Sequence, residues 1–200
     1  MTKPEDILPT YDAVGPHWAR VERDTSLFER AHLERMLDAA PGRGVLDLGC
    51  GSGRPVAHWL AGTGARVTGV DGAASMIALF RRSVPDARAV HADMRGLALG
   101  ERFDAILAFD SFFHLCPDDQ RAMFATFAAH AAPGAALMFT AGPAASVRVG
   151  QVAGRRVYHA SLDPEEYRHL MRAAGFRPVS YHPEDPACRG RTVWHAVFDA

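Results

Sequence analysis

Short strand-like segments alternate with amphipathic helical ones from residue 44 onward. The strand-like segments are 44–49, 65–71, 87–93, 103–110 and 134–141. Helical patterns begin at Pro55, Ala73 and Pro117. The segment 103–110 is almost continuously apolar, as in a parallel strand that is buried on both faces. This alternation predicts an α/β fold, in which a doubly wound, mostly parallel sheet carries helices on both faces.

The last third of the chain departs from this alternation. Asp163 and Glu166 form a capping-box pattern, with Pro164 at the first position of the predicted helix. Two strand-like segments remain, 176–182 and 192–200. The nine residues between them are too few for a helical crossover, so these two strands are expected to pair antiparallel.

Length and composition limit the class of protein. Two hundred residues make one domain the default, and a formal net charge of −1 provides no basic surface that would attract nucleic acid. The three cysteines form no CxxC pair, which favours a reducing compartment. The N-terminal segment MTKPEDILPT lacks the apolar run of a signal peptide, and no window of about eighteen apolar residues could span a membrane. We therefore expect a cytoplasmic protein.

Three glycines at alternate positions follow an aspartate in the segment VLDLGCGSG. Gly49, Gly51 and Gly53 give up side-chain contacts and backbone order, which is costly unless the bare backbone is needed. A tight turn needs only one such glycine. A strand, a glycine loop and a helix in this order place a ligand above the helix N-terminus, where free N–H groups point outward. The segment therefore predicts a ligand-binding loop.

The spacing within this loop argues against a dinucleotide. The dinucleotide fingerprint is G-x-G-x-x-G, whereas these glycines stand two residues apart and are followed by Arg54 and Pro55. Asp47 lies near the end of the first predicted strand, where a carboxylate would repel phosphates and attract a cationic group. A nicotinamide-dependent dehydrogenase is therefore disfavoured.

The pattern Asp47-x-Gly49-x-Gly51-x-Gly53 resembles the first motif of the class I S-adenosylmethionine (SAM)-dependent methyltransferases. The similarity is to a bacterial branch of small-molecule enzymes. The methyl donor of this family carries an ammonium and a sulfonium and no phosphate. The resemblance spans roughly residues 11–199. It implies a seven-stranded Rossmann-like methyltransferase fold, with six parallel strands and one reversed strand in an antiparallel C-terminal pair.

Further landmarks of the family follow in order along the chain. Asp71 ends the second predicted strand and matches the acid that binds the ribose hydroxyls. Asp93 matches the acid that meets the adenine amino group, and Met76 and Met94 would pack on the adenine ring. The segment 103–115 matches the fourth-strand motif, whose end faces the methyl group. The resemblance thus implies cofactor contacts from Tyr11, Trp18, Asp47, Gly49, Cys50, Gly51, Gly53, Asp71, Gly72, Met76, Asp93, Met94 and Phe109.

Two residues that follow the fourth predicted strand are catalytic candidates. His114 lies beside the expected methyl position, where it could deprotonate a hydroxyl or an amine, or else hydrogen-bond within its own loop. Asp110 occupies the place where metal-dependent members hold a cation. A metal site needs several oxygen ligands, and the end of the fifth strand, FTAGPA, offers no acid or amide. No metal is therefore expected, and Asp110 is predicted to bind the donor's amino group or to orient the substrate.

The tetrapeptide DSFF (110–113) differs from a related motif in the family. Enzymes that methylate amino groups of bases and of glutamine carry Asn/Asp-Pro-Pro-aromatic at this place. The difference disfavours nucleic acids and proteins as substrates.

The whole chain, 1–200, is predicted to be one methyltransferase domain. Residues 1–40 are expected to form a helical cap, in which Tyr11 and Trp18 either stack near the sulfonium or pack as ordinary helix residues. Residues 141–162 are longer than a simple connection and predict a lid-like hairpin. Arg148, Arg155 and Arg156 of this hairpin could recognise an acidic substrate, with Tyr158 and His159 lining the pocket, but a solvated hairpin with exposed arginines is favoured.

These features favour an enzyme that transfers the methyl group of SAM to a small molecule by in-line displacement. The alternative is a non-catalytic or regulatory SAM-binding protein, which would lack a pocket open at the methyl group. The patterns leave the acceptor atom and the oligomeric state open.

Overall fold

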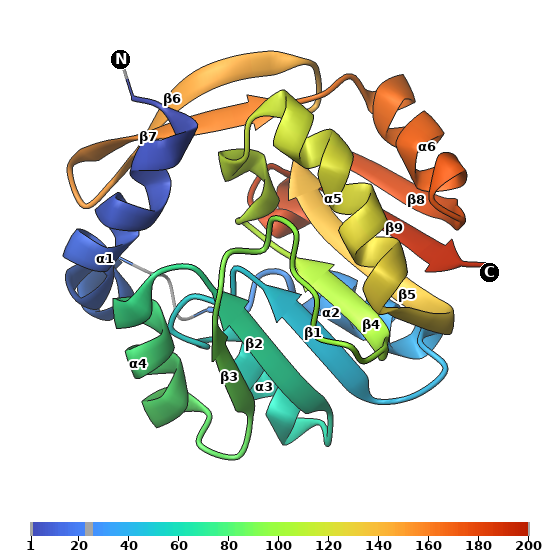
Figure 1. Cartoon of the computed structure of the whole chain (residues 1–200), viewed down its shortest axis with the longest axis horizontal. Helices are drawn as coiled ribbons and strands as arrows, with labels where there is room; N and C mark the ends of the chain where they lie inside the picture. The colour runs from blue at the N-terminus through green and yellow to red at the C-terminus, as the bar shows by residue number, and fades with distance from the viewer. Residues whose placement is uncertain (1, 23–25, 200) are drawn as a thin grey trace.

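The computed structural model of the chain describes residues 2–22 and 26–199. Its central element is a seven-stranded sheet in the order β3-β2-β1-β4-β5-β9-β8 (Figure 1). These strands are β1 (Gly44–Leu48), β2 (Arg66–Asp71), β3 (Arg88–His91), β4 (Phe103–Ala108), β5 (Ala131–Ala141), β8 (Phe176–Asp185) and β9 (Arg191–Phe198). Strand β9 runs antiparallel to both β5 and β8, and the other neighbouring pairs are parallel. Six strands therefore share one direction and one is reversed, which confirms the predicted topology.

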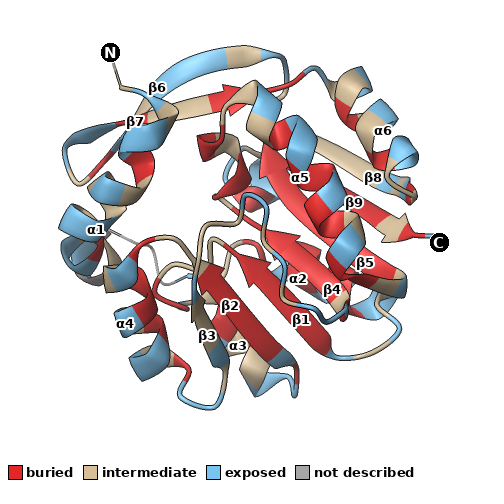
Figure 2. Cartoon of the chain, in the orientation of Figure 1, coloured by how far each residue is buried: buried red, intermediate tan, exposed pale blue. Residues whose placement is uncertain are grey.

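Helices cover both faces of the sheet, because successive strand residues point to opposite sides. Val45 belongs to the core of one face and Leu46 to the core of the other. Figure 2 shows that the central strands are buried almost throughout. The first face carries α2 (Arg30–Ala39), α3 (Val56–Gly62) and α4 (Ala74–Ser83), and the second carries α5 (Pro117–His130) and α6 (Pro164–Ala173). The doubly wound arrangement is thus confirmed.

Helix α6 begins where its sequence pattern predicts. Asp163 caps it by accepting a hydrogen bond of 2.8 Å from the backbone N–H of Glu165, and Pro164 occupies the first turn. Tyr167 and Met171 are fully buried on the inward face of this helix. None of the helices in the described ranges has the length and apolarity needed to cross a bilayer.

One boundary differs from the sequence expectation. The fifth strand, expected to span residues 134–141, begins three residues earlier, at Ala131. The pairing of β5 with β4 shifts in register at this point. Such an irregularity accommodates Pro133, which cannot donate to the ladder, and Gly134, whose φ is +77°.

The core on the α5 and α6 face is largely aromatic and fixes a short 3-10 helix, η3 (Phe112–His114). Phe112 is fully buried, and its ring centroid lies 5.2 Å from that of Phe139 and 6.0 Å from that of Tyr167. Because Phe112 is anchored in this way, the next two residues, Phe113 and His114, are held at a fixed place beyond the end of β4.

The N-terminal helix α1 (Ile7–His17) packs on a separate hairpin, β6 (Ser146–Val152) and β7 (Arg155–Ser161), which crosses above the sheet (Figure 1). On the outer side of the hairpin, Val147 and Val149 are 63% and 48% exposed. The residues of the contact between helix and hairpin are Ile7, Leu8, Tyr11, Val14, Trp18, Val152 and Val157. That this hairpin moves as a lid stays a prediction.

Candidate active site

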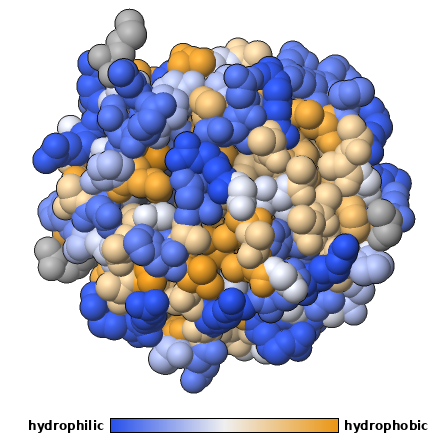
Figure 3. Space-filling view, viewed as in Figure 1, coloured by the Kyte–Doolittle hydropathy of each residue, from blue (hydrophilic) through white to orange (hydrophobic). Residues whose placement is uncertain are grey.

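A cavity of about 420 Å³ lies at the carboxyl ends of β1, β2 and β4, where doubly wound sheets bind their ligands. Helix α1 and the β6–β7 hairpin contribute a further wall. Figure 3 shows the molecule in the orientation of Figure 1, with apolar side chains exposed in patches between hydrophilic ones. The structure brings together here all fifteen residues that the sequence marks: Tyr11, Trp18, Asp47, Gly49, Cys50, Gly51, Gly53, Asp71, Gly72, Met76, Asp93, Met94, Phe109, Asp110 and His114.

The three glycines of the loop after β1 meet three different requirements. A Cβ on Gly49 would lie 2.3 Å from the Cβ of Ser111, so this glycine lets the segment after β4 approach β1. A Cβ on Gly53 would lie 2.9 Å from the ring of Phe80 in the core. A Cβ on Gly51 would meet no atom within 4 Å, because this residue borders the open cavity. The φ angle is positive at all three residues, +76° at Gly49, +55° at Gly51 and +79° at Gly53, and such a backbone conformation favours glycine.

Asp71 ties the glycine loop to the end of β2. Its Oδ2 accepts a hydrogen bond of 2.9 Å from the N–H of Gly51, and its Oδ1 accepts one of 2.8 Å from the N–H of Ala73. Burial raises the pKa of this carboxyl group, and the two backbone N–H groups offset part of that effect. Each oxygen retains a lone pair. The carboxylate can therefore hold the loop and accept the two hydroxyls of a ribose at the same time.

Asp47 is a buried carboxylate in β1, only 4% exposed. None of the described residues donates a hydrogen bond to it. Burial, and then the negative charge of Asp71, raise the pKa of Asp47 to about 7. A buried charge without a partner is costly, so this position fits a ligand that brings a cation. The ammonium of SAM is such a group.

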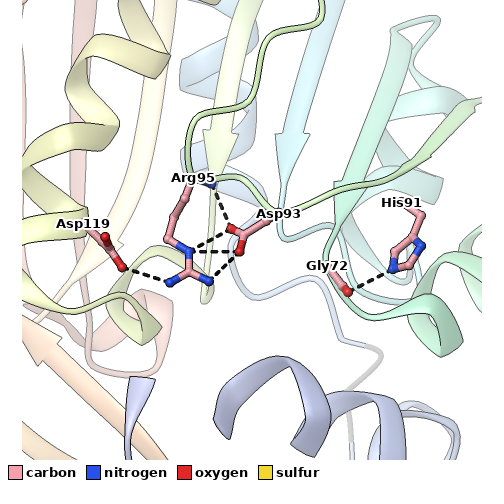
Figure 4. Close-up of polar contacts among 5 residues, drawn as sticks. All are labelled: Gly72, His91, Asp93, Arg95 and Asp119. Atoms are coloured by element: carbon pink, nitrogen blue, oxygen red, sulfur yellow. Dashed lines mark hydrogen bonds and ion pairs between the residues drawn. The ribbon is translucent and has the colours of Figure 1, made fainter. Parts of the chain in front are cut away.

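Arg95 links the predicted adenine-binding acid to α5 (Figure 4). Its Nε donates to both oxygens of Asp93, at 3.1 and 2.9 Å, and its Nη1 donates to Asp119 at 3.1 Å. Burial would raise the pKa of Asp93, but the hydrogen bonds from Arg95 outweigh it and lower the pKa. Asp93 is therefore a fixed, ionised acceptor. In the same view, Nε2 of His91 lies 3.0 Å from the carbonyl oxygen of Gly72.

His114 is buried, and both of its ring nitrogens are engaged. Nδ1 lies 3.0 Å from the carbonyl oxygen of Tyr158, which can only accept, so Nδ1 carries the proton. The unprotonated Nε2 then accepts a hydrogen bond of 3.2 Å from the hydroxyl of Tyr11. Burial lowers the pKa of His114 to about 4, although the Tyr158 carbonyl offsets part of the effect. The imidazole is therefore neutral near pH 7.

Asp110 is held at the cavity wall by an ion pair. Its carboxylate accepts hydrogen bonds from Arg191, with Nη2–Oδ2 at 2.9 Å and Nε–Oδ2 at 3.2 Å. The Arg191 guanidinium in turn lies 5.1 Å from the ring centroid of Phe28. The roles predicted for Asp110, in binding the donor's amino group or orienting the substrate, stay predictions.

Several lining residues escape the motif-based reasoning, among them Arg95, Arg191 and Phe28. Arg95 stands two positions after Asp93, and this spacing alone only weakly indicates that the two side chains form an ion pair. Arg191 and Phe28 carry no motif, and only the strand pairing brings Arg191 to the end of β4.

Two comparisons with known proteins identify the family. A family model described as a methyltransferase domain matches residues 45–134. A curated relative from Streptomyces fradiae, dTDP-3-amino-3,6-dideoxy-alpha-D-glucopyranose N,N-dimethyltransferase, is 32% identical over 199 residues, covering 90% of this chain and 75% of the relative. The chain belongs to the SAM-dependent methyltransferases.

One further relative is similar in sequence, and two solved structures share the fold. The cypemycin N-terminal methyltransferase of a Streptomyces species is 34% identical over 151 residues, which cover 73% of this methyltransferase and 59% of the relative. The SAM-bound amino pentose methyltransferase of Micromonospora echinaspora superposes with a TM-score of 0.72 at 21% identity, covering 93% and 96% of the two chains. The Burkholderia thailandensis 1,6-didemethyltoxoflavin-N1-methyltransferase superposes with a TM-score of 0.71 at 24% identity, covering 98% and 87%. The methyl donor of this methyltransferase is SAM.

The affinity of the methyltransferase for S-adenosylhomocysteine (SAH) is expected to fall in acid. With a pKa of about 7, Asp47 is mostly ionised at pH 8 and mostly protonated at pH 6 in the free protein. A ligand ammonium binds the ionised form, so binding weakens by roughly tenfold between pH 8 and pH 6. Isothermal titration calorimetry at several pH values measures this slope. In Asp47→Asn the SAH affinity should depend much less on pH. An unchanged pH dependence in that variant would show that Asp47 does not cause it.

Proposed function

We propose that this methyltransferase transfers the methyl group of SAM to an amine nitrogen of a small polar molecule. The observation that carries the proposal is the similarity, over 90% of the chain, to an enzyme named as an amino-sugar N,N-dimethyltransferase. The toxoflavin-type N1-methyltransferase and a glycopeptide N-methyltransferase share the fold. A neutral amine carries the lone pair that such a reaction requires.

The donor side of the cavity supports this function, because it offers a carboxylate to each of three parts of SAM. Asp47 suits the ammonium, Asp71 suits the ribose hydroxyls and Asp93 suits the adenine amino group. SAM supplies a methyl group on a cationic sulfur, and the chain has to align the acceptor with it. Alignment of two reactants in one site contributes on the order of 7 kcal/mol to lowering a barrier.

The wall formed by η3 and β7 suits an amine as acceptor. The rings of Phe113, His114 and His159 contact one another, with centroids 4.8 to 4.9 Å apart. Burial lowers the pKa of both imidazoles, so both are uncharged at neutral pH. Positive charge moves from sulfur to nitrogen during the transfer. A wall of uncharged rings does not oppose that charge, and aromatic faces attract it.

Turnover with labelled SAM tests the proposal. The acceptor panel pairs each amine with its hydroxyl analogue: amino sugars with the parent sugars, free and as dTDP conjugates. We expect label in one or more amines and none in the matching hydroxyl compounds. Transfer to hydroxyls or thiols alone would contradict an amine acceptor, and SAH binding without transfer to any acceptor class would indicate a binding protein instead.

Replacing His114 is expected to slow turnover about fivefold, while SAH affinity stays within about twofold of wild type. The reason is that a buried imidazole with a pKa of about 4 is a poor proton carrier but a good hydrogen-bond acceptor, and one such bond is worth about 1 kcal/mol. The measurement is kcat and KM for His114→Asn and Tyr11→Phe, with calorimetry for SAH. A loss of 1,000-fold in His114→Asn alone would restore the general-base role that the sequence suggests.

A further inference from the structure

His159, on β7, lines the cavity as part of the aromatic wall, and no proton-transfer role has been assigned to it so far. It is half-buried, and its ring centroid lies 4.8 Å from that of Phe113 and 4.8 Å from that of His114. The hairpin thus brings a second imidazole to the wall against which the acceptor is expected to lie.

Gly150, on the neighbouring strand β6, makes room for this imidazole. A Cβ on Gly150 would lie 2.4 Å from Cε1 and 2.8 Å from Nε2 of His159. The ring therefore occupies the space that any side chain at position 150 would take. The pairing of β6 with β7 fixes the position of His159 through this contact.

The hydrogen bonds of the two imidazoles differ. Within the described part of the chain, neither ring nitrogen of His159 has a hydrogen-bond partner. In His114, by contrast, Nδ1 is bonded to the carbonyl of Tyr158 and Nε2 to the hydroxyl of Tyr11. A neutral imidazole has one nitrogen that can take a proton. In His159 that nitrogen is available to a molecule in the cavity.

We propose that His159 is the catalytic base that takes the proton of the acceptor amine. This inference rests on the proposed amine methylation. As the nitrogen–carbon bond forms, the sulfur–carbon bond breaks and its electron pair stays on sulfur, which leaves neutral SAH. Positive charge develops on the nitrogen as the bond forms. In the same step one N–H proton passes from that nitrogen to a ring nitrogen of His159, and the half-exposed imidazolium then releases that proton to water.

The charges that face His159 favour this role. Burial lowers the pKa of His159, while the carboxylate of Asp110 at the end of β4 acts in the opposite direction and stabilises the imidazolium. Arg191 pairs with Asp110 and so partly offsets the negative charge that acts on His159. Arg148 lies opposite His159 in the pairing of β6 with β7 and is exposed to solvent. No carboxylate acts in this way on His114, which is neutral.

Kinetics with the fastest amine of the acceptor panel test the base. Glutamine can accept a hydrogen bond but cannot take up a proton, so His159→Gln is expected to lower kcat about 100-fold with KM within about threefold. Added imidazole should restore part of the activity of His159→Ala. The control is His169→Asn, at an exposed histidine on α6, which should match wild type. A kcat of His159→Gln within threefold of wild type would overturn the proposal.

An NMR titration separates this inference from the proposed function, because it needs no acceptor. The pKa of His159 is measured in ¹⁵N-histidine-labelled protein with SAH and with sinefungin, which carries an amine in place of the transferable methyl group. We expect a lower pKa with sinefungin, since its ammonium would face the imidazole, and a lower pKa in Asp110→Asn with SAH. If neither ligand binds, the proposed function falls as well. If both bind and the His159 pKa is unchanged, only the base assignment is wrong.

Discussion

Replacing Gly51 by alanine is expected to weaken SAH binding about 100-fold, and replacing it by valine is expected to abolish binding. A side chain at this position would meet no protein atom within 4 Å, so it would extend into the cavity rather than into the core. It would take the space of the ligand and pull the Gly51 N–H away from Asp71. A factor of 100 corresponds to roughly 2.7 kcal/mol of binding free energy. Calorimetry measures the affinity directly.

The matched control for this variant is Gly64→Ala. Gly64 also has a positive φ, +86°, and a Cβ there would likewise meet nothing within 4 Å. It lies in the turn between α3 and β2 and does not border the cavity. Both substitutions carry the same kind of backbone strain, so their melting temperatures should fall by similar amounts. Equal SAH affinities in the two variants would contradict the placement of the donor over the glycine loop.

Asp71→Ala is the second substitution with a large expected effect. It removes the acceptor for the N–H groups of Gly51 and Ala73 as well as the predicted partner of the ribose hydroxyls. We expect SAH affinity to fall by at least about 100-fold, and the free energy of unfolding to fall by about 1–3 kcal/mol because buried donors lose their partner. Calorimetry and urea unfolding measure the two effects separately.

Two further variants serve as controls for the loss of SAH affinity in Asp71→Ala. Asp71→Asn keeps one acceptor oxygen and should give an intermediate SAH affinity. Asp86→Ala, an exposed aspartate in the turn after α4, should bind SAH as wild type does. If Asp71→Ala loses stability but binds SAH within threefold of wild type, then Asp71 supports only the loop and the ribose lies elsewhere.

The donor half of the site could be predicted from the sequence because its residues follow the strands that position them. Asp47 and Asp71 lie at or near the carboxyl ends of parallel neighbours, and those ends meet at one edge of the sheet. The spacing of Gly49, Gly51 and Gly53 reflects three local contacts that only glycine allows. Such constraints act over short stretches of chain, so a linear pattern records them.

The acceptor half could not be predicted in the same way, because long-range packing assembles it. The hydrogen bond between Tyr11 and His114 joins residues 103 positions apart, and the ion pair between Asp110 and Arg191 spans 81 positions. The sequence suggests His159 as a lining residue, but not its neighbours, because the place of its hairpin over the cavity depends on the contact with α1. The sequence also does not predict the register shift between β4 and β5 around Pro133. Such a bulge depends on the partner strand as much as on the sequence of the bulged strand.

A crystal structure of the methyltransferase grown with saturating SAH tests the central claim most directly. The account predicts the ligand in the cavity at the ends of β1, β2 and β4. Its ammonium should be nearest Asp47, its ribose hydroxyls on Asp71 and its adenine amino group on Asp93, with the sulfur facing the wall of His114 and His159. A cavity that stays empty, or that binds SAH with the adenine at the Asp47 end, would contradict it.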